Sequence, residues 1–158
     1  MKIFISHQRA DSTCAVRISK RLSEVHGISS YLDVIDPSTP KSAEELAEHV
    51  QRELGKCSQL LTVVSAATQS SWWVPWEIGI ATEKNFPLST YSEGQTPLPE
   101  YLKKWPYLRS ESDIDKYAEA SKYADTNLLN KRSYLAEGAA RTSATQLFYT
   151  KIRASLRQ

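Results

Sequence analysis

A short tryptophan-rich segment carries the residues best suited to chemistry in this 158-residue chain. Residues 70–77 read Ser-Ser-Trp-Trp-Val-Pro-Trp-Glu and hold three of the four tryptophans. Trp73 and Glu77 are four residues apart, so a helix through this segment would place both on one face. That face lies near a helix N-terminus, which in a parallel α/β sheet points toward the ligand crevice. The structural alternative is that the tryptophans fill the core while Glu77 is a solvated surface acid.

The sequence lacks the motifs of several other kinds of site. The chain has five glycines and contains neither of the glycine-rich phosphate-binding motifs, GxxxxGKS/T and GxGxxG, nor a GxSxG nucleophile motif. His7, His26 and His49 are scattered, without a second ligand at metal spacing. Cys14 and Cys57 are too few for a disulfide framework and have no zinc-binding partners. We therefore expect no metal site and two buried, inert thiols.

Length and composition predict a single globular domain. Hydrophobic residues make up 41% of the chain and charged residues 24%, a balance that excludes disordered, collagen-like and coiled-coil proteins. No stretch reaches the roughly 18 apolar residues that a membrane span requires. Lys2 leads directly into a strand-like run, without the hydrophobic region of a signal peptide. We expect a cytoplasmic protein with no membrane partner.

The charge of the chain is unevenly distributed. The formal net charge is only +2, which singles out no partner and does not favour nucleic acid. A basic C-terminal segment could contact an anionic partner, although a solvated helix face is the simpler interpretation. Within residues 131–158, Glu137 is the single acid, against Lys131, Arg132, Arg141, Lys151, Arg153 and Arg157.

The hydrophobic pattern predicts alternating strands and helices. Short apolar runs bounded by polar or turn residues indicate buried strands. Four such runs occur, at Ile3–Ser6, Ile28–Leu32, Leu60–Val64 and Pro87–Tyr91.

Helix signals fill the first two intervals. One helix begins near Ser12 and stops at Gly27, a residue type that commonly ends helices. The next begins with a capping box formed by Ser42 and Glu45. Apolar residues recur at helical spacing in both, as Ala15, Ile18, Leu22 and Val25, and as Ala43, Leu46, Ala47, Val50 and Leu54.

The third interval contains the tryptophan-rich segment. Ser70 or Ser71 is the predicted N-cap of a helix that runs to about Lys84. Pro75 fits this helix only in its first turn, where a missing N–H is tolerated.

The pattern weakens after residue 92. A helical turn at Glu100–Lys104, an edge strand at Tyr107–Leu108 and a helix at Ser112–Tyr123 are predicted, whereas residues 125–142 give no clear assignment. A final amphipathic helix carries Ala144, Leu147, Phe148, Ile152 and Leu156. We therefore expect one domain over residues 1–158, with a core in residues 2–91 completed by extra helices in residues 92–158.

This order of elements implies βαβ crossovers, hence an α/β fold with a central parallel sheet and helices on both faces. Ligands of such sheets bind beyond the carboxyl ends of the strands. The polar segments at those ends are residues 6–9, 33–36 and 65–71. A binding site is expected where these three segments meet.

Four segments, in order, resemble the TIR (Toll/interleukin-1 receptor) domain family. The resemblance covers residues 2–91, and the following Leu-Pro-Glu-Tyr-Leu at residues 98–102 is most similar to stand-alone bacterial TIR proteins of antiphage defence, the Thoeris type. The four segments are Lys2–His7, Ile28–Asp33, Cys57–Ser65 and Ser71–Glu77, the last resembling the family's WxxxE motif.

The resemblance implies a flavodoxin-like TIR fold and cleavage of NAD⁺ at the nicotinamide–ribose bond. Glu77 occupies the position of the family's catalytic glutamate, and NAD⁺ is a substrate, so no cofactor is expected. The cationic nicotinamide leaves as a neutral molecule and needs no general acid, which fits a single carboxylate where glycosidases use two. The product would be ADP-ribose or a cyclic isomer, and a diffusible nucleotide could signal to a separate effector protein.

The resemblance also suggests roles for residues around Glu77. Trp73 would pack on the ribose or brace the carboxylate, with a core role as the alternative. Ser6, His7 and Arg9 lie where the family contacts the nucleotide, and Arg9 could meet a phosphate. Asp33 would bind the ligand or cap the following loop.

Two departures from the family pattern keep other functions open. The loop after the second strand has Pro37 and Pro40 but no glycine, and in the family this loop governs self-assembly through TIR–TIR contacts. His7-Gln8 replaces an aromatic–arginine pair of some NAD⁺-cleaving members. The alternative function is a non-enzymatic adaptor module that assembles with other TIR domains. A receiver or flavodoxin-like nucleotide binder shares the topology, but a receiver requires acids after the first strand, where Ser6-His7-Gln8 stands.

Overall fold

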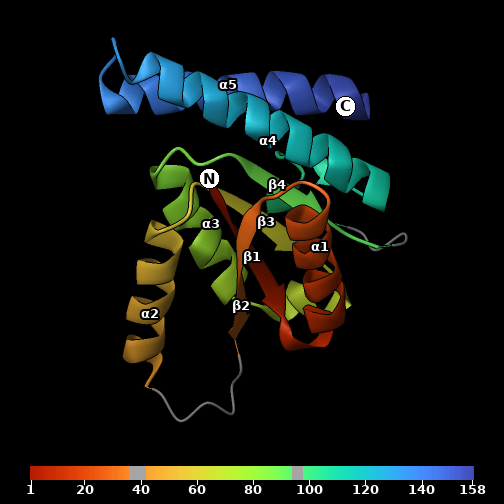
Figure 1. The fold of residues 1–158 in the computed structure, drawn as a ribbon. Coiled ribbons are helices and arrows are strands. Elements are labelled where there is room, and N and C mark those ends of the chain that lie inside the picture. The colour runs from red at the N-terminus through yellow and green to blue at the C-terminus, as the bar shows by residue number, and fades with distance from the viewer. Residues whose placement is uncertain (36–41, 94–97) are drawn as a thin grey trace.

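The computed structural model describes residues 1–35, 42–93 and 98–158, and Figure 1 shows its fold. Five parallel strands form one sheet in the order β2-β1-β3-β4-β5. This is the strand order of flavodoxin-like folds, so the predicted α/β class is confirmed. The strands are β1 (Lys2–Gln8), β2 (Ser29–Ile35), β3 (Gln59–Val63), β4 (Leu88–Tyr91) and β5 (Tyr107–Leu108).

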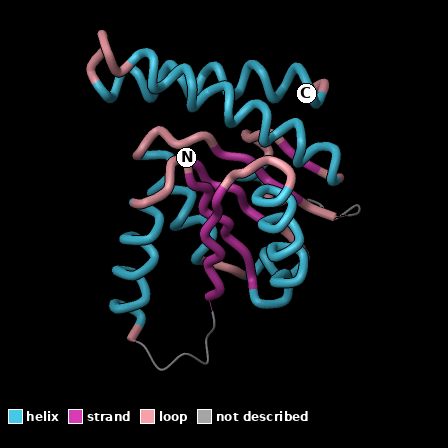
Figure 2. Tube along the Cα trace, in the orientation of Figure 1, coloured by secondary structure: helices cyan, strands magenta, loops and turns pink. Residues whose placement is uncertain are grey.

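Helices cover both faces of the sheet (Figure 2). The α-helices are α1 (Ser12–Glu24), α2 (Ala43–Gly55), α3 (Trp73–Glu83), α4 (Glu111–Lys131) and α5 (Glu137–Leu156). Short 3₁₀ turns are η1 (Arg9–Asp11), η2 (Ala66–Ser70) and η3 (Glu100–Leu102).

The strands divide their side chains between two hydrophobic clusters, as the alternation of a β-strand requires. Ile3 and Ile5 of β1 pack in a cluster that also contains residues of α1, α4 and α5. Phe4, between them, packs with residues of α2 and α3. Leu60 and Leu61 of β3 divide in the same way. The predicted helices on both faces are therefore confirmed, with α2 and α3 on one face and α1 and α4 on the other.

The first two helices are close to the predictions. Gly27 has a φ of +64° and donates to Ser23 O, and this ends α1 as expected. The spacing predicts Val25 on the apolar face, but as the C-cap of α1 it is 62% exposed. Ser42 and Glu45 form the predicted capping box of α2.

The first two strands extend further toward their carboxyl ends than predicted. β1 includes His7 and Gln8, and β2 continues through Asp33 to Ile35, because the two strands stay in register over seven residue pairs. Backbone pairing continues here although the side chains become polar. His7 and Asp33 are therefore strand residues, and the expected loop after Ser6 begins only at Arg9.

The helices α4 and α5 lie side by side across the amino-terminal end of the sheet, next to the N-terminus (Figure 1). Ser121 Oγ and Tyr117 Oη of α4 both donate to Gln59 Oε1 at the start of β3, at 2.8 and 3.0 Å. The predicted helix at residues 112–123 is longer, and the unassigned residues 125–142 contain the end of α4 and the start of α5. Their periodic signal is weak because α4 packs largely through small side chains such as Ala120 and Ala124.

Within the described ranges, no helix is both long and apolar enough to cross a bilayer.

Candidate active site

The carboxyl end of β1 lies where the strand order of the sheet changes direction. Ser6 pairs in register with Asp33 of β2 on one side and with Thr62 of β3 on the other. From β1 the chain crosses to β2 at one edge and then back to β3 beyond β1. In open parallel sheets, ligands bind outside the carboxyl ends of the strands at such a point.

Glu77 of α3 reaches this position. The Ser6 hydroxyl donates a hydrogen bond to Glu77 Oε2. Both side chains are buried, with exposed fractions of 1% for Ser6 and 0% for Glu77. The structural alternative of a solvated surface acid is therefore wrong, and the two residues, 71 positions apart, form one buried polar contact.

The start of α3 differs from the prediction. The helix begins at Trp73 with Trp72 as its N-cap, one or two residues later than the predicted caps Ser70 and Ser71. The 3₁₀ turn η2 includes Ser70, and Ser71 follows in extended conformation. Ser71 Oγ still accepts from the backbone N–H of Val74, at 3.4 Å. Pro75 lies in the first turn, as expected.

Strand alternation separates the residues that follow Ser6. Gln8, two positions on, shares the face of Ser6, and its Nε2 donates to Ser71 Oγ at 2.6 Å. His7 shares the opposite face with Ile3 and Ile5, toward α1, and its Nδ1 lies 3.2 Å from Ile5 O. The structure thus places Ser6 against Glu77, with His7 on the opposite face of β1. Gln8 was not predicted, although its two-residue spacing from Ser6 is a signal that could have found it.

Three tryptophan rings form a cluster beside Glu77. Trp73, at 9% exposed, stacks on Trp72 with ring centroids 4.3 Å apart and contacts Trp76 edge-on at 5.4 Å. Trp72 is 64% exposed, so the cluster extends from the core to the surface. Trp73 and Glu77 lie on one face of α3, as their spacing predicted.

A second carboxylate lies at the same end of the sheet. Ser65, just after β3, donates from Oγ to Asp11 Oδ2 at 2.9 Å. Ser65 N–H also donates to Thr68 Oγ1 at 3.1 Å, which ties the start of η2 to the strand. Asp11 was not among the predicted site residues. Its position one short turn beyond β1 is the signal that could have found it.

The structure tests less of what was predicted for Arg9, Asp33 and the two loop prolines. Arg9 opens η1 with an exposed side chain, so a phosphate contact stays a prediction. Asp33 is placed by its backbone pairing with Ser6. Pro37 and Pro40 lie outside the described residues.

Metal and thiol chemistry find no support in the described residues. No three His, Cys, Asp or Glu side chains among them are grouped as a metal site. Cys57 is buried as predicted, and burial raises the pKa of its thiol to about 11; Cys14 is only half-buried, contrary to the prediction, and partial burial also raises its pKa. Because the thiolate is the reactive form, neither cysteine is poised as a nucleophile.

Comparisons with known proteins gave one family match and two weak structural similarities. A family model described as "TIR domain" matches residues 3–121. No curated protein matches the chain. The TIR domains of the activated Roq1 resistosome, which recognises the pathogen effector XopQ, are 16% identical, with 99% of this chain and 97% of that chain covered and a TM-score of 0.46. A diflavin flavoprotein A3 from Nostoc sp. is 15% identical over the same shares, with a TM-score of 0.42.

These two structural similarities are too weak to support an argument about fold or function. The family match is different, because it spans most of the chain and includes both Ser6 and Glu77. The chain belongs to the TIR-domain family.

Proposed function

We propose that this protein cleaves NAD⁺ at the nicotinamide–ribose bond and that Glu77 is its catalytic residue. One observation carries the proposal: a fully buried carboxylate, held by Ser6, lies at the point of the sheet where ligands of such folds bind. The resemblance of residues 71–77 to the family's catalytic segment agrees with it.

The energetics of α3 support a chemical role for this acid. The other buried positions of the helix are apolar or aromatic: Trp73, Val74, Ile78 and Ala81. A buried carboxylate is destabilising relative to an apolar side chain of similar size, even when it is hydrogen-bonded. Packing alone therefore gives no reason for a glutamate at this position.

The proposed reaction needs only one carboxylate, and its atoms and charges balance. The bond between ribose C1′ and the pyridinium nitrogen breaks, and its electron pair leaves with neutral nicotinamide. The positive charge that develops on the ribose is stabilised by the Glu77 carboxylate. Water then adds to C1′ and releases one proton, which gives ADP-ribose. If an adenine nitrogen attacks instead, the product is a cyclic isomer.

Access to the carboxylate requires a rearrangement, because none of Glu77 is exposed in this chain. We propose that a path from solvent to the site opens beside Trp72, which is exposed and stacked on Trp73. We propose that self-assembly through TIR–TIR contacts, or a trigger, opens this path. As in the bacterial antiphage proteins that the sequence resembles, the nucleotide product would then act on a separate effector.

The test measures nicotinamide by chromatography after incubation of NAD⁺ with the purified protein, at low and high concentration and with a crowding agent. We expect release that rises with protein concentration and falls at least ~100-fold in Glu77→Gln. Glu83→Gln, which neutralises an exposed acid on the same helix, is the matched control and should keep full activity. Equal release by wild type and Glu77→Gln would overturn the proposal.

A non-enzymatic adaptor is the second candidate, and the closed site is the observation that favours it. If Glu77 stays buried, the chain would act only by assembling with TIR domains. Light scattering across a concentration series tests this directly. Assembly of wild type and Glu77→Gln without nicotinamide release by either would favour the adaptor.

A further inference from the structure

A second hollow lies at the opposite end of the sheet, between its amino end and the α4–α5 pair. This amino-end groove has a volume of about 360 Å³, and its walls include Lys2, Lys56, Leu128, Leu129, Arg132 and Arg141. A smaller hollow over Gln59 and Asn85 shares Arg141 and Leu128 with it. The groove is separate from the Glu77 site.

Cations from four different parts of the chain converge on this groove. Lys2 comes from β1, Lys56 follows α2, Arg132 follows α4 and Arg141 belongs to α5. Asp125 is the one acid that lines it.

The acids that pair with these cations lie outside the walls of the groove. Lys56 Nζ contacts Glu53 Oε1 at 2.7 Å. Arg132 and Arg141 share a single oxygen, Glu137 Oε1, at 3.1 and 2.8 Å. A guanidinium carries more N–H donors than this sharing uses, so both arginines can donate to a further anion.

The favourable interaction of cations with the carboxyl ends of helices explains only two of these four positive charges. Lys56 and Arg132 cap the carboxyl ends of α2 and α4, where cations are favourable in any protein. Lys2 and Arg141 occupy no helix end. Four cations gathered around one hollow therefore exceed what the two helix dipoles account for.

The smaller adjoining hollow offers another donor, and the groove itself has an apolar wall. Gln59 is 97% buried, and its Oε1 is occupied by Tyr117 and Ser121. Its Nε2 donates to Met1 Sδ at 3.3 Å, and a thioether is a weak acceptor that an oxygen could replace. Leu129, 60% exposed, supplies apolar surface at the mouth. The site thus presents donors and positive charge on several sides.

We propose that the amino-end groove binds a phosphorylated small molecule, with Lys2, Lys56, Arg132 and Arg141 holding its phosphate oxygens. A diphosphate spreads its charge over several acceptor oxygens, which matches cations that approach from opposite walls. The basic C-terminal segment noted in the sequence contributes two of the four. The groove lies at the far end of the sheet from Glu77, so this proposal does not depend on NAD⁺ cleavage.

The test is calorimetric titration of the full chain with inorganic pyrophosphate at constant ionic strength. We expect saturable binding that weakens at least ~10-fold in Lys56→Gln and in Arg141→Gln. Lys103→Gln is the matched control, since Lys103 also pairs with an acid three residues before it and is 58% exposed, against 56% for Lys56. Thermal unfolding of each variant checks that it is folded.

Two further arms make the result decisive. The same titration of Glu77→Gln should give unchanged affinity, which separates this groove from the proposed active site. Tighter binding of ADP than of pyrophosphate would extend the proposal to a nucleotide, with its base on Leu128 and Leu129. Equal weakening in Lys103→Gln, equal binding of sulfate, loss of binding in Glu77→Gln, or no binding at all would overturn the proposal.

Discussion

Buried polar side chains lie at both ends of the sheet, but the two ends use them differently. At the amino end, Gln59 accepts from Tyr117 and Ser121, and all three side chains are neutral. At the carboxyl end, Ser6 donates to Glu77, a side chain that can carry a full charge. The same sheet therefore buries a neutral network at one end and an ionisable acid at the other.

This contrast indicates that the buried polar side chains at the amino end of the sheet serve stability, and that those at the carboxyl end do not. A neutral network joins α4 to β3 at little electrostatic cost, because each donor has an acceptor. A buried carboxylate does the reverse, since its charge is disfavoured away from water. Four substitutions test this contrast, beginning with the largest expected effect.

Glu77→Gln should separate activity from stability. We expect nicotinamide release to fall at least ~100-fold, as in the loss of one key electrostatic group of an active site. The amide still accepts from Ser6 and carries no charge, so the free energy of unfolding in urea should be unchanged or higher. A marked loss of stability would instead make Glu77 a structural residue and remove the contrast between the two ends.

Gln59→Leu should give the opposite result. The substitution leaves the buried hydroxyls of Tyr117 and Ser121 without their acceptor, which lowers the free energy of unfolding by about 2–4 kcal/mol. Activity per folded molecule should not change. Gln51→Leu, at an exposed position of α2, is the control for the change of residue type. Urea unfolding measures the difference, and equal stability of the two variants would contradict the role assigned to Gln59.

Ser6→Ala should affect both stability and activity. A hydrogen bond to a charged acceptor contributes about 1.5–3 kcal/mol, and its loss leaves the Glu77 carboxylate less well held. We expect lower stability by this amount and ~10-fold slower nicotinamide release. Ser89 is a buried serine of β4 whose Oγ has no hydrogen-bond partner among the described residues, so Ser89→Ala is the matched control. Similar losses in both variants would show an effect of the strand rather than of the hydrogen bond.

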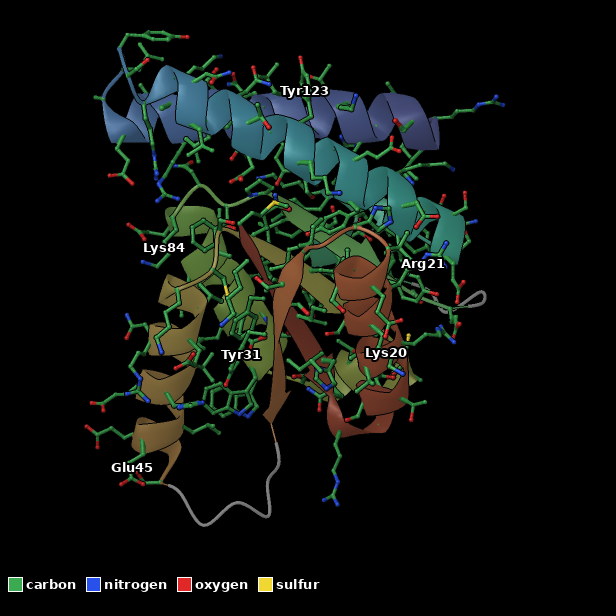
Figure 3. All side chains as sticks on the ribbon, in the orientation of Figure 1. Lys20, Arg21, Tyr31, Glu45, Lys84 and Tyr123 are labelled. Atoms are coloured by element: carbon green, nitrogen blue, oxygen red, sulfur yellow. The ribbon has the colours of Figure 1, made fainter. Side chains whose placement is uncertain are left out.

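The smallest effect concerns the ion pair that joins α1 to α4 near the amino end (Figure 3). Arg21 donates to both carboxylate oxygens of Asp115, at 2.8 and 2.7 Å, and lowers the pKa of Asp115 from 3.8 to about 2. Because this pKa is lowered by folding, its contribution to stability is complete above about pH 4 and is lost as the pH falls toward 2.

Asp115→Asn should therefore reduce the loss of stability between pH 4 and pH 2, measured by thermal unfolding. The effect is small because the ion pair is partly solvated. Glu119→Gln, an exposed acid on α4, is the control. An identical pH profile for wild type and Asp115→Asn would assign the acid sensitivity to other carboxylates.

Much of the fold was predictable because its signals are local. Apolar runs marked the strands, Gly27 marked the end of α1, and Ser42 with Glu45 marked the start of α2. The boundaries after residue 110 were not predictable in the same way. There α4 contacts the sheet through small residues and a polar network. The apolar residues of its sequence therefore show only a weak helical periodicity.

The site was predictable in part, for a related reason. The spacing of Trp73 and Glu77 on one helix face required only local geometry. The bond between Ser6 and Glu77 depends on how the chain returns after 71 residues, and no local pattern contains that information. The family resemblance grouped His7 with Ser6 at the nucleotide site, and that role stays a prediction. Strand alternation places the two side chains on opposite faces of β1.

The division of the sheet between two clusters also has a consequence during synthesis. All residues of the Ser6–Glu77 contact are made by residue 77, yet Ile3, Ile5 and Leu61 face a cluster completed by Tyr117 of α4 and Phe148 of α5. At about 5–20 residues per second, a ribosome needs roughly 4–14 s to go from Glu77 to Phe148. Throughout that interval α1 alone covers this face of the nascent sheet, and the aliphatic side chains that α4 and α5 will later cover stay open to aggregation or to capture by a chaperone.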